Sequence, residues 1–214
     1  MAFPPSLIRI REDEALREIT LSGSVIDLGG GKDSGYRRIF KGEYTVTSAN
    51  LDGHATTDIH CDLEEPLPIA DRTYNNVLLI NVLEHIYHAR ELMAETARII
   101  TPGGKLVIAV PFLFPVHPSP SDYWRFTGET LKRLCADAGY TDVVVTPLAA
   151  GVLSTRFVSL DRLMPQPIRV VGYYVGLPVV LFCDHVFTSV ARMLGRRYNP
   201  SEYPTGYLVV ATRK

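Results

Sequence analysis

The side chains best suited to chemistry lie in one stretch, residues 111–127, which holds an imidazole, a carboxylate, a phenol and a guanidinium. The pKa of histidine lies near neutral pH, so the imidazole of His117 is suited to remove a proton from a hydroxyl group. The guanidinium of Arg125 is suited to bind a carboxylate or phosphate group of an acceptor. We therefore predict His117 as a catalytic base and Asp122, Tyr123 and Arg125 as substrate-binding residues.

A purely structural reading of the same stretch stays open. Asp122 and Arg125 would then pair to hold the loop, while Tyr123 and Trp124 pack against the domain. His85, in the sequence Leu-Glu-His-Ile at residues 83–86, is likewise open to two readings. It either contacts substrate beside a cleft, which is the role we predict, or orients the turn into the next segment.

A second chemical feature is the run Val-Ile-Asp-Leu at residues 25–28, which three consecutive glycines follow, Gly29, Gly30 and Gly31. Glycine has no Cβ and tolerates positive φ, so such a run lets backbone approach a ligand closely. At the carboxyl end of a first strand, this is where open α/β sheets bind nucleotide-like ligands. A plain glycine-rich turn is the alternative.

The remaining predicted strands also end in residues that suit a nucleoside ligand. The carboxyl ends of parallel strands meet at one edge of a sheet, so these residues are expected to lie close together. A polar side chain after the second strand is suited to a ribose hydroxyl, and one after the third to an adenine amine. The residues concerned are Asn50 and Leu51, then Asp62 and Leu63, then Asn81 and Val82.

The elements that position these residues alternate between strand and helix. Nearly continuous apolar runs such as residues 77–80 and 105–111 suit strands that are buried on both faces. Thr127 is a good N-cap for a helix that runs to Ala138, and Gly139 suits the position after it. The alternation predicts a doubly wound α/β sheet. Expected strands are residues 24–28, 44–49, 58–62, 77–80, 105–111, 142–147 and 206–212; expected helices are 6–20, 33–40, 88–100 and 127–138.

Size and composition are those of one globular domain of 214 residues. A net charge of −1 gives no reason to expect nucleic acid as a partner. The three cysteines are far apart and are read as buried apolar residues, and the histidines are scattered, so no metal site is predicted. No signal peptide is visible, and a cytoplasmic protein is expected.

Residues 151–203 do not follow the alternation. They form an apolar insertion, with about 14 uncharged residues from Val170 to Cys183, shorter than the about 20 needed to cross a bilayer. Two ordinary helices packed on the domain are the simplest expectation. A lid, a homodimer contact and a peripheral contact with the inner face of the membrane stay open.

Taken together, the motifs resemble those of class I S-adenosylmethionine-dependent methyltransferases of the small methyltransferase-domain type. The resemblance covers about residues 22–148, and the last strand, 205–213, fits as well. It rests on the glycine loop, Asp-Leu at 62–63 with Pro-Leu-Pro at 66–68, Val-Leu-Glu-His-Ile at 82–86, and Ala-Arg-Ile-Ile-Thr-Pro-Gly-Gly-Lys-Leu at 97–106. The family usually has an acid where this chain has Asn50, and a glycine where it has Asp33.

The resemblance implies a Rossmann-like, seven-stranded sheet with a terminal antiparallel hairpin, and S-adenosyl-L-methionine as cofactor. It implies that Asp27 and the glycines lie near the methionine part, Asn50 at the ribose, Asp62 and Leu63 at the adenine, and Asn81 beneath the sulfonium. The stretch 111–127 resembles a subset often associated with polysaccharide synthesis. We therefore expect an O-methyltransferase acting on a small molecule or glycan precursor.

Two other functions fit the sequence less well. A nicotinamide-dependent oxidoreductase would need glycine at Ser34, so its dinucleotide fingerprint fails. A non-catalytic methyltransferase-like domain would bind a partner or membrane through residues 151–203. The intact glycine loop argues against that alternative.

Overall fold

A seven-stranded sheet forms the centre of the chain, in the order β3-β2-β1-β4-β5-β7-β6. The computed structural model describes residues 6–51, 56–149, 151–161 and 163–214. Strands β1 to β5 pair in parallel, and β7 runs antiparallel to both β5 and β6. The predicted doubly wound sheet with its antiparallel hairpin is confirmed. The strands are β1 (Gly23–Leu28), β2 (Tyr44–Asn50), β3 (Ile59–His60), β4 (Tyr74–Ile80), β5 (Ile100–Pro111), β6 (Tyr140–Ala149) and β7 (Pro204–Arg213).

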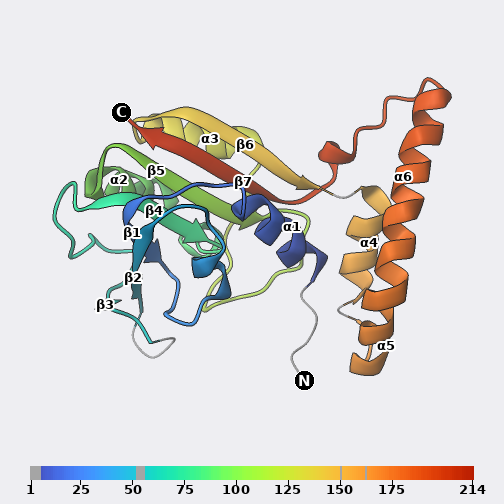
Figure 1. Ribbon diagram of the computed structural model, residues 1–214, viewed down its shortest axis with the longest axis horizontal. Coiled ribbons are helices and arrows are strands. Elements are labelled where there is room, and N and C mark those ends of the chain that lie inside the picture. Colours follow the sequence, from blue (N-terminus) through green and yellow to red (C-terminus); the bar gives the residue numbers. More distant parts are fainter. Residues whose placement is uncertain (1–5, 52–55, 150, 162) are drawn as a thin grey trace.

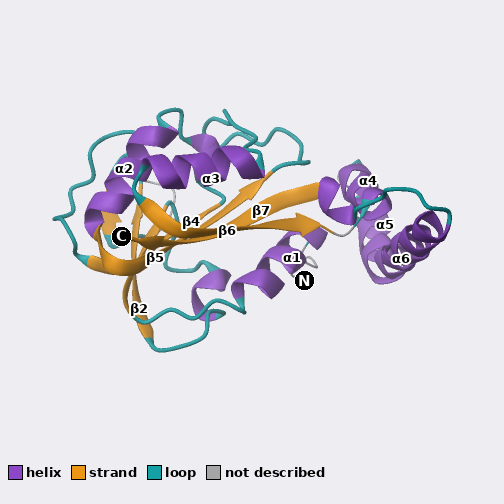
Figure 2. Ribbon diagram, turned by 90° about the horizontal axis from the view of Figure 1, so that it is seen from above, coloured by secondary structure: helices purple, strands orange, loops and turns teal. Residues whose placement is uncertain are grey.

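Helices cover both faces of this sheet. Helices α2 (Ala89–Ile99) and α3 (Gly128–Asp137) lie on one face, and α1 (Leu7–Leu16) lies on the other (Figure 2). The sheet is buried between them because its central strands carry apolar residues on both faces. In β4, every residue from Asn76 to Ile80 is buried.

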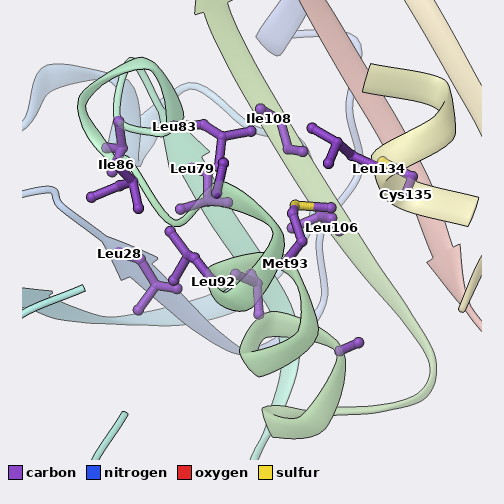
Figure 3. Packing of buried hydrophobic residues seen from close by; sticks show 14 of the residues in the cluster. Leu28, Leu79, Leu83, Ile86, Leu92, Met93, Leu106, Ile108, Leu134 and Cys135 are labelled. Atoms are coloured by element: carbon purple, nitrogen blue, oxygen red, sulfur yellow. The ribbon is translucent and has the colours of Figure 1, made fainter. Parts of the chain in front are cut away.

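The main core lies between the sheet and the α2–α3 layer. Leucine, isoleucine and methionine side chains from strands and helices interdigitate there (Figure 3). Leu92 and Met93 of α2 are almost fully buried, as are Leu79 of β4 and Leu106 of β5. Truncating one such leucine to alanine is expected to cost about 2–5 kcal/mol. This packing fixes the strand ends from which the candidate site is built.

Helix ends follow the expected local chemistry in two places. The Thr127 side chain accepts a hydrogen bond from the backbone N–H of Thr130, so it is the N-cap of α3. Gly139 has φ +85°, the left-handed conformation that suits glycine after a helix. Ser6 likewise caps α1, which ends at Leu16, before the predicted limit of residue 20.

Three expected boundaries are wrong. The helix expected at residues 33–40 is a single 3₁₀ turn, Gly35–Arg38, since the segment is too short for a stable α-helix. Strand β3 has two residues, whereas a strand over residues 58–62 is expected. Strand β5 begins at Ile100, directly after α2 and before the expected start at residue 105, so residues 102–104 lie within the strand, where its register with β4 shifts.

The insertion forms a helical arm rather than helices packed on the domain. Helices α4 (Val152–Asp161), α5 (Gln166–Val171) and α6 (Leu177–Met193) project from one end of the sheet (Figure 1). Much of its apolar surface is exposed, as at Phe182 and Met193. Cys183 is also exposed, against the expectation that all three cysteines are buried; Cys135 is buried and Cys61 half-buried.

The apolar run is also longer than the sequence indicated. Helices α5 and α6 join through a π turn, Gly172–Gly176, into one helical stretch. Gln166–Met193 spans 28 residues with a mean hydropathy of 1.6 in its most apolar window, and that window is 11% buried. By length and composition alone, this stretch is sufficient to cross a membrane. Pro178 lies in the first turn of α6, directly after the π turn, a position at which a helix tolerates proline.

Candidate active site

A cavity of about 260 Å³ opens at the carboxyl ends of the parallel strands. It contains seven of the ten residues predicted to bind the cofactor, contributed by the loops after β1, β2, β3 and β4. These are Gly29, Asn50, Leu51, Asp62, Leu63, Asn81 and Val82. His85 and Tyr123, predicted to contact substrate, also line it. The fold therefore brings residues that are distant in the sequence to one edge of the sheet.

The glycine loop is shaped by close contacts that side chains would prevent. Gly29 has φ +81°, and a Cβ there would lie 2.5 Å from the side chain of Val82. A Cβ on Gly30 would lie 2.0 Å from the carboxylate of Asp27. The loop therefore needs glycine at both positions. Gly30, Gly31 and Asp27 lie beside the cavity rather than in its lining.

Asp27 is fully buried at the end of β1. The hydroxyl of Tyr36 donates to its two carboxylate oxygens, both at 3.1 Å. Burial raises the pKa of Asp27 to about 7, because the charged form loses its hydration, and the Tyr36 hydrogen bond and the nearby charge of Arg37 oppose this only in part. Tyr36 was not predicted as part of the site.

The polar residues after β2 and β3 bind the local backbone. The Asn50 amide donates to the carbonyl of Gly29 at 2.8 Å and accepts from the N–H of Leu51 at 2.8 Å. The Asp62 carboxylate accepts from the N–H of Glu64 at 2.9 Å, a local turn. These contacts hold both loops open around the cavity.

Helix α1, on the other face of the sheet, contacts the loop that follows β4. The Asn81 amide donates to the carboxylate of Glu12 at 2.9 Å, and Arg9 pairs with the same carboxylate at 2.6 Å. Asn81 has φ +55°, a conformation that asparagine tolerates better than most residues. Glu12 is 2% exposed, and this burial raises its pKa. Glu12 was missed from the sequence, because its helix shows no pattern that points inward at the site.

The loop of residues 112–127 is held by an internal ion pair. Arg125 makes a two-pronged contact with Asp122, at 2.5 and 2.7 Å, and also donates to the carbonyls of Trp124 and Pro115. The guanidinium lowers the pKa of Asp122 far below its ordinary value. The second oxygen of Asp122 accepts from the backbone N–H of His117 at 2.8 Å. This geometry matches the structural reading of the pair, and their substrate contact stays a prediction.

The loop docks onto the turn that follows β4. The backbone N–H groups of Tyr123 and Trp124 donate to the carbonyl of Glu84 at 2.9 and 3.1 Å. The Trp124 indole donates to the carbonyl of Ile86 at 3.0 Å. These bonds fix the position of His117 relative to the short 3₁₀ helix Leu83–His85.

Three side chains that the sequence did not connect meet at this junction. Oε1 of Glu84 lies 3.6 Å from Nε2 of His85 and 3.7 Å from Nε2 of His117. Glu84 is fully buried, and neither of its carboxylate oxygens accepts a hydrogen bond from the described part of the chain. Burial raises the pKa of Glu84 to about 8 and lowers that of His117. No periodicity signals that these residues converge, although the motif at 82–86 contains two of them.

Comparison with known proteins agrees with this geometry. Residues 6–145 match the family described as "Methyltransferase domain". The chain is 29% identical over 92 residues to O-methyltransferase rstn1 of Aspergillus nomiae, a match that covers 38% of this chain and 41% of the relative. The chain thus spans less than half of that relative's length.

Solved structures share the fold at low identity. A Thermotoga maritima SAM-dependent methyltransferase, a possible histamine N-methyltransferase, has a TM-score of 0.58 at 12% identity, with 97% of this chain and 92% of that chain covered. Haemonchus contortus phosphoethanolamine N-methyltransferase 2 with S-adenosyl-L-methionine has a TM-score of 0.57 at 16% identity, with 94% and 52% covered. The family expected from the sequence is confirmed: the chain belongs to the methyltransferase-domain family, the class I S-adenosylmethionine-dependent methyltransferases.

Proposed function

We propose that this chain binds S-adenosyl-L-methionine in the cavity at the carboxyl ends of β1, β2 and β4, and transfers its methyl group to an acceptor hydroxyl. The observation that carries the proposal is the cavity itself, which gathers Gly29, Asn50, Asp62 and Asn81 around one space. The sulfonium is a strong electrophile, so positioning of donor and acceptor supplies most of the rate.

Oxygen is the proposed acceptor atom because a histidine lies beside the cavity. A sugar hydroxyl is a poor nucleophile, and a general base that removes its proton assists the transfer. His117 is 25% exposed, with its Nε2 directed at the Glu84–His85 turn. The similarity to an O-methyltransferase also supports this choice. In the His117→Ala variant, turnover should fall while the affinity for the cofactor stays unchanged.

The acceptor we propose is a glycan precursor or other small molecule presented at a membrane surface by a peripheral, cytoplasmic protein. The arm connects the end of β6 to the start of β7. Backbone hydrogen bonds join the base of the arm to the loop that carries His117, since the N–H of Phe112 donates to the carbonyl of Thr205 at 2.8 Å. An acceptor held at the base of the arm would therefore lie near that loop.

Calorimetric titration with S-adenosyl-L-methionine and S-adenosylhomocysteine tests the cofactor, with NAD as the negative control. We expect micromolar binding of the first two compounds only. Gly30→Ala should weaken this binding by more than about tenfold, because the added Cβ meets the Asp27 carboxylate and displaces the loop.

Gly35→Ala is the matched control, since a Cβ there meets nothing within 4 Å. It should bind the cofactor as the wild type does, and circular dichroism should show both variants folded. If the wild-type chain bound neither S-adenosyl compound, the proposed function would be wrong. A non-catalytic domain that works through its arm would then be favoured, and the exposed apolar surface of α6 is the observation behind that second candidate.

A further inference from the structure

The junction of Glu84, His85 and His117 brings three potential metal-ligating atoms close together. A carbonyl oxygen can only accept, so Nδ1 of His85, which lies 2.5 Å from the carbonyl of Ser121, carries the ring proton. In the neutral ring, Nε2 then has a free lone pair. The proton of the ring is fixed by backbone rather than by the carboxylate it faces.

His117 is arranged in the same way. Its Nδ1 lies 3.1 Å from the carbonyl of Pro115 and 3.3 Å from the carboxylate of Asp122, which are two acceptors, and 3.4 Å from the Arg125 guanidinium, which is a donor. The two acceptors favour a proton on Nδ1, which again leaves the Nε2 lone pair free. Metal-binding histidines are typically oriented in this way, with the second ring nitrogen bound to a carbonyl or carboxylate.

The buried carboxylate completes the set. All three ligand atoms lie within 4.8 Å of one another. Donors at 2.0–2.2 Å from one ion are themselves about 3.0–3.6 Å apart, close to the 3.6 and 3.7 Å that separate Glu84 from the two histidines. A fully buried carboxyl group with no hydrogen-bond partner in the described part of the chain must either keep its proton or meet a cation, and an ion between the three groups would take the place of that proton.

We propose that Glu84, His85 and His117 bind a divalent transition-metal ion of the Zn²⁺ type. Two imidazoles and one carboxylate suit such an ion better than Mg²⁺ or Ca²⁺, which prefer oxygen ligands. Three protein ligands leave at least one coordination position for a water or substrate oxygen. His85 also lines the cofactor cavity, so the ion lies at its edge.

The site changes the role expected of His117. A metal-bound Nε2 is not available as a base, and the ion itself would lower the pKa of a hydroxyl group bound to its open position. This consequence rests on the proposed methyl transfer. The metal site itself does not, because it can be measured without turnover.

The test is titration of untagged, EDTA-treated and dialysed protein with Co²⁺, followed by its visible absorption, and with Zn²⁺ by calorimetry. We expect one ion per chain and an absorption typical of four- or five-coordinate Co²⁺. Glu84→Gln and His117→Ala should each weaken binding by more than about tenfold, since even indirect ligand support is worth that much. His88→Ala, an exposed histidine outside the junction, should bind as the wild type does.

Failure of the wild-type protein to bind either ion at micromolar concentration would overturn the metal site. Equal binding by the wild type and both site variants would also overturn it, since the ion would then lie elsewhere. Circular dichroism identifies a variant that has not folded, and His117, being partly exposed, is the safer of the two changes. Binding of S-adenosyl-L-methionine by the same EDTA-treated protein shows whether the proposed function stands when the metal site fails.

Discussion

The buried carboxyl group of Asp27 makes the stability of the folded chain depend on pH. Its pKa in the folded chain is about 7, whereas aspartate in an unfolded chain titrates near 4. Between these two pKa values, Asp27 keeps its proton in the folded state and has lost it in the unfolded state. The chain is therefore destabilised as pH rises from about 4 to 7, by roughly 4 kcal/mol at most at about 1.4 kcal/mol per pKa unit.

We predict that Asp27→Asn removes this pH dependence. The melting temperature of the variant relative to that of the wild type should increase from pH 5 to pH 8. The reason is that the amide keeps the size of the carboxyl group and does not ionise. Melting temperatures across that range measure the effect.

Asp58→Asn is the control for that comparison. Lys32 and Ser48 lower the pKa of Asp58 to about 2, so Asp58 is ionised in both folded and unfolded chains above pH 5. Its variant should differ from the wild type by the same amount at pH 5 and pH 8. A gain that is equal at both pH values for Asp27→Asn would show that its carboxyl group has no raised pKa.

At the scale of elements, the arm is held together by a buried acid of α6. Asp184 is 2% exposed and accepts hydrogen bonds from the backbone N–H groups of Leu153 and Ser154, at 3.0 and 2.7 Å. The Tyr198 hydroxyl accepts from the N–H of Val152 at 2.9 Å. The first turn of α4 thus obtains its cap from the second half of the arm rather than from its own sequence.

Asp184→Ala should therefore loosen α4 without unfolding the sheet. The loss of a helix cap costs about 1–2 kcal/mol, and hydrogen exchange of the amides at residues 153 and 154 should speed up accordingly, while the amides of β4 stay protected. Glu202→Ala removes an exposed acid near the arm and should change neither region. Faster exchange throughout β4 would contradict a cap confined to the arm.

The sheet and the cavity could be predicted from sequence because their signals are local. Apolar runs such as residues 77–80 mark buried strands, and parallel strands bring their ends together at one edge. The course of the arm could not be predicted in this way. Its apolar residues fit a packed helix equally well, and the uncharged run alone is shorter than the helix that α5, the π turn and α6 form together. The meeting of Glu84 with His117 depends on how a long loop docks, which no spacing reveals.

The whole molecule divides into a globular domain and an exposed apolar arm (Figure 1). Exposed apolar surface of this extent needs a partner. Residues 151–203 carry six arginines against three acidic residues, so the arm has a positive charge that complements an anionic lipid surface. This charge favours the membrane over a second copy of the chain, which would repel it.

We predict that the chain co-sediments with vesicles containing phosphatidylglycerol and binds phosphatidylcholine vesicles more weakly. Val175→Asp combined with Phe182→Asp should abolish the binding, since both side chains are exposed on the arm, 60% and 67%. Val144→Asp places the same change at a 60% exposed site on β6 and should keep it. The arm would instead be a dimer contact if light scattering showed a stable dimer that the double variant loses and that vesicles do not change.

The position of the arm in the chain also has a consequence for the order of folding. Ala149 of β6 pairs with Pro204 of β7, so β6 and β7 form an antiparallel hairpin whose connection is the whole arm. A turn of a few residues would be enough to connect two such strands. Closing the long loop instead costs roughly 2 kcal/mol more in chain entropy than a four-residue turn would. Within the described residues, β6 pairs with β7 alone, and β7 lies beside β5. This pairing between distant segments should therefore form late and limit the folding rate. Until it forms, β5 has an unpaired edge, and the half-folded chain is the state most exposed to aggregation.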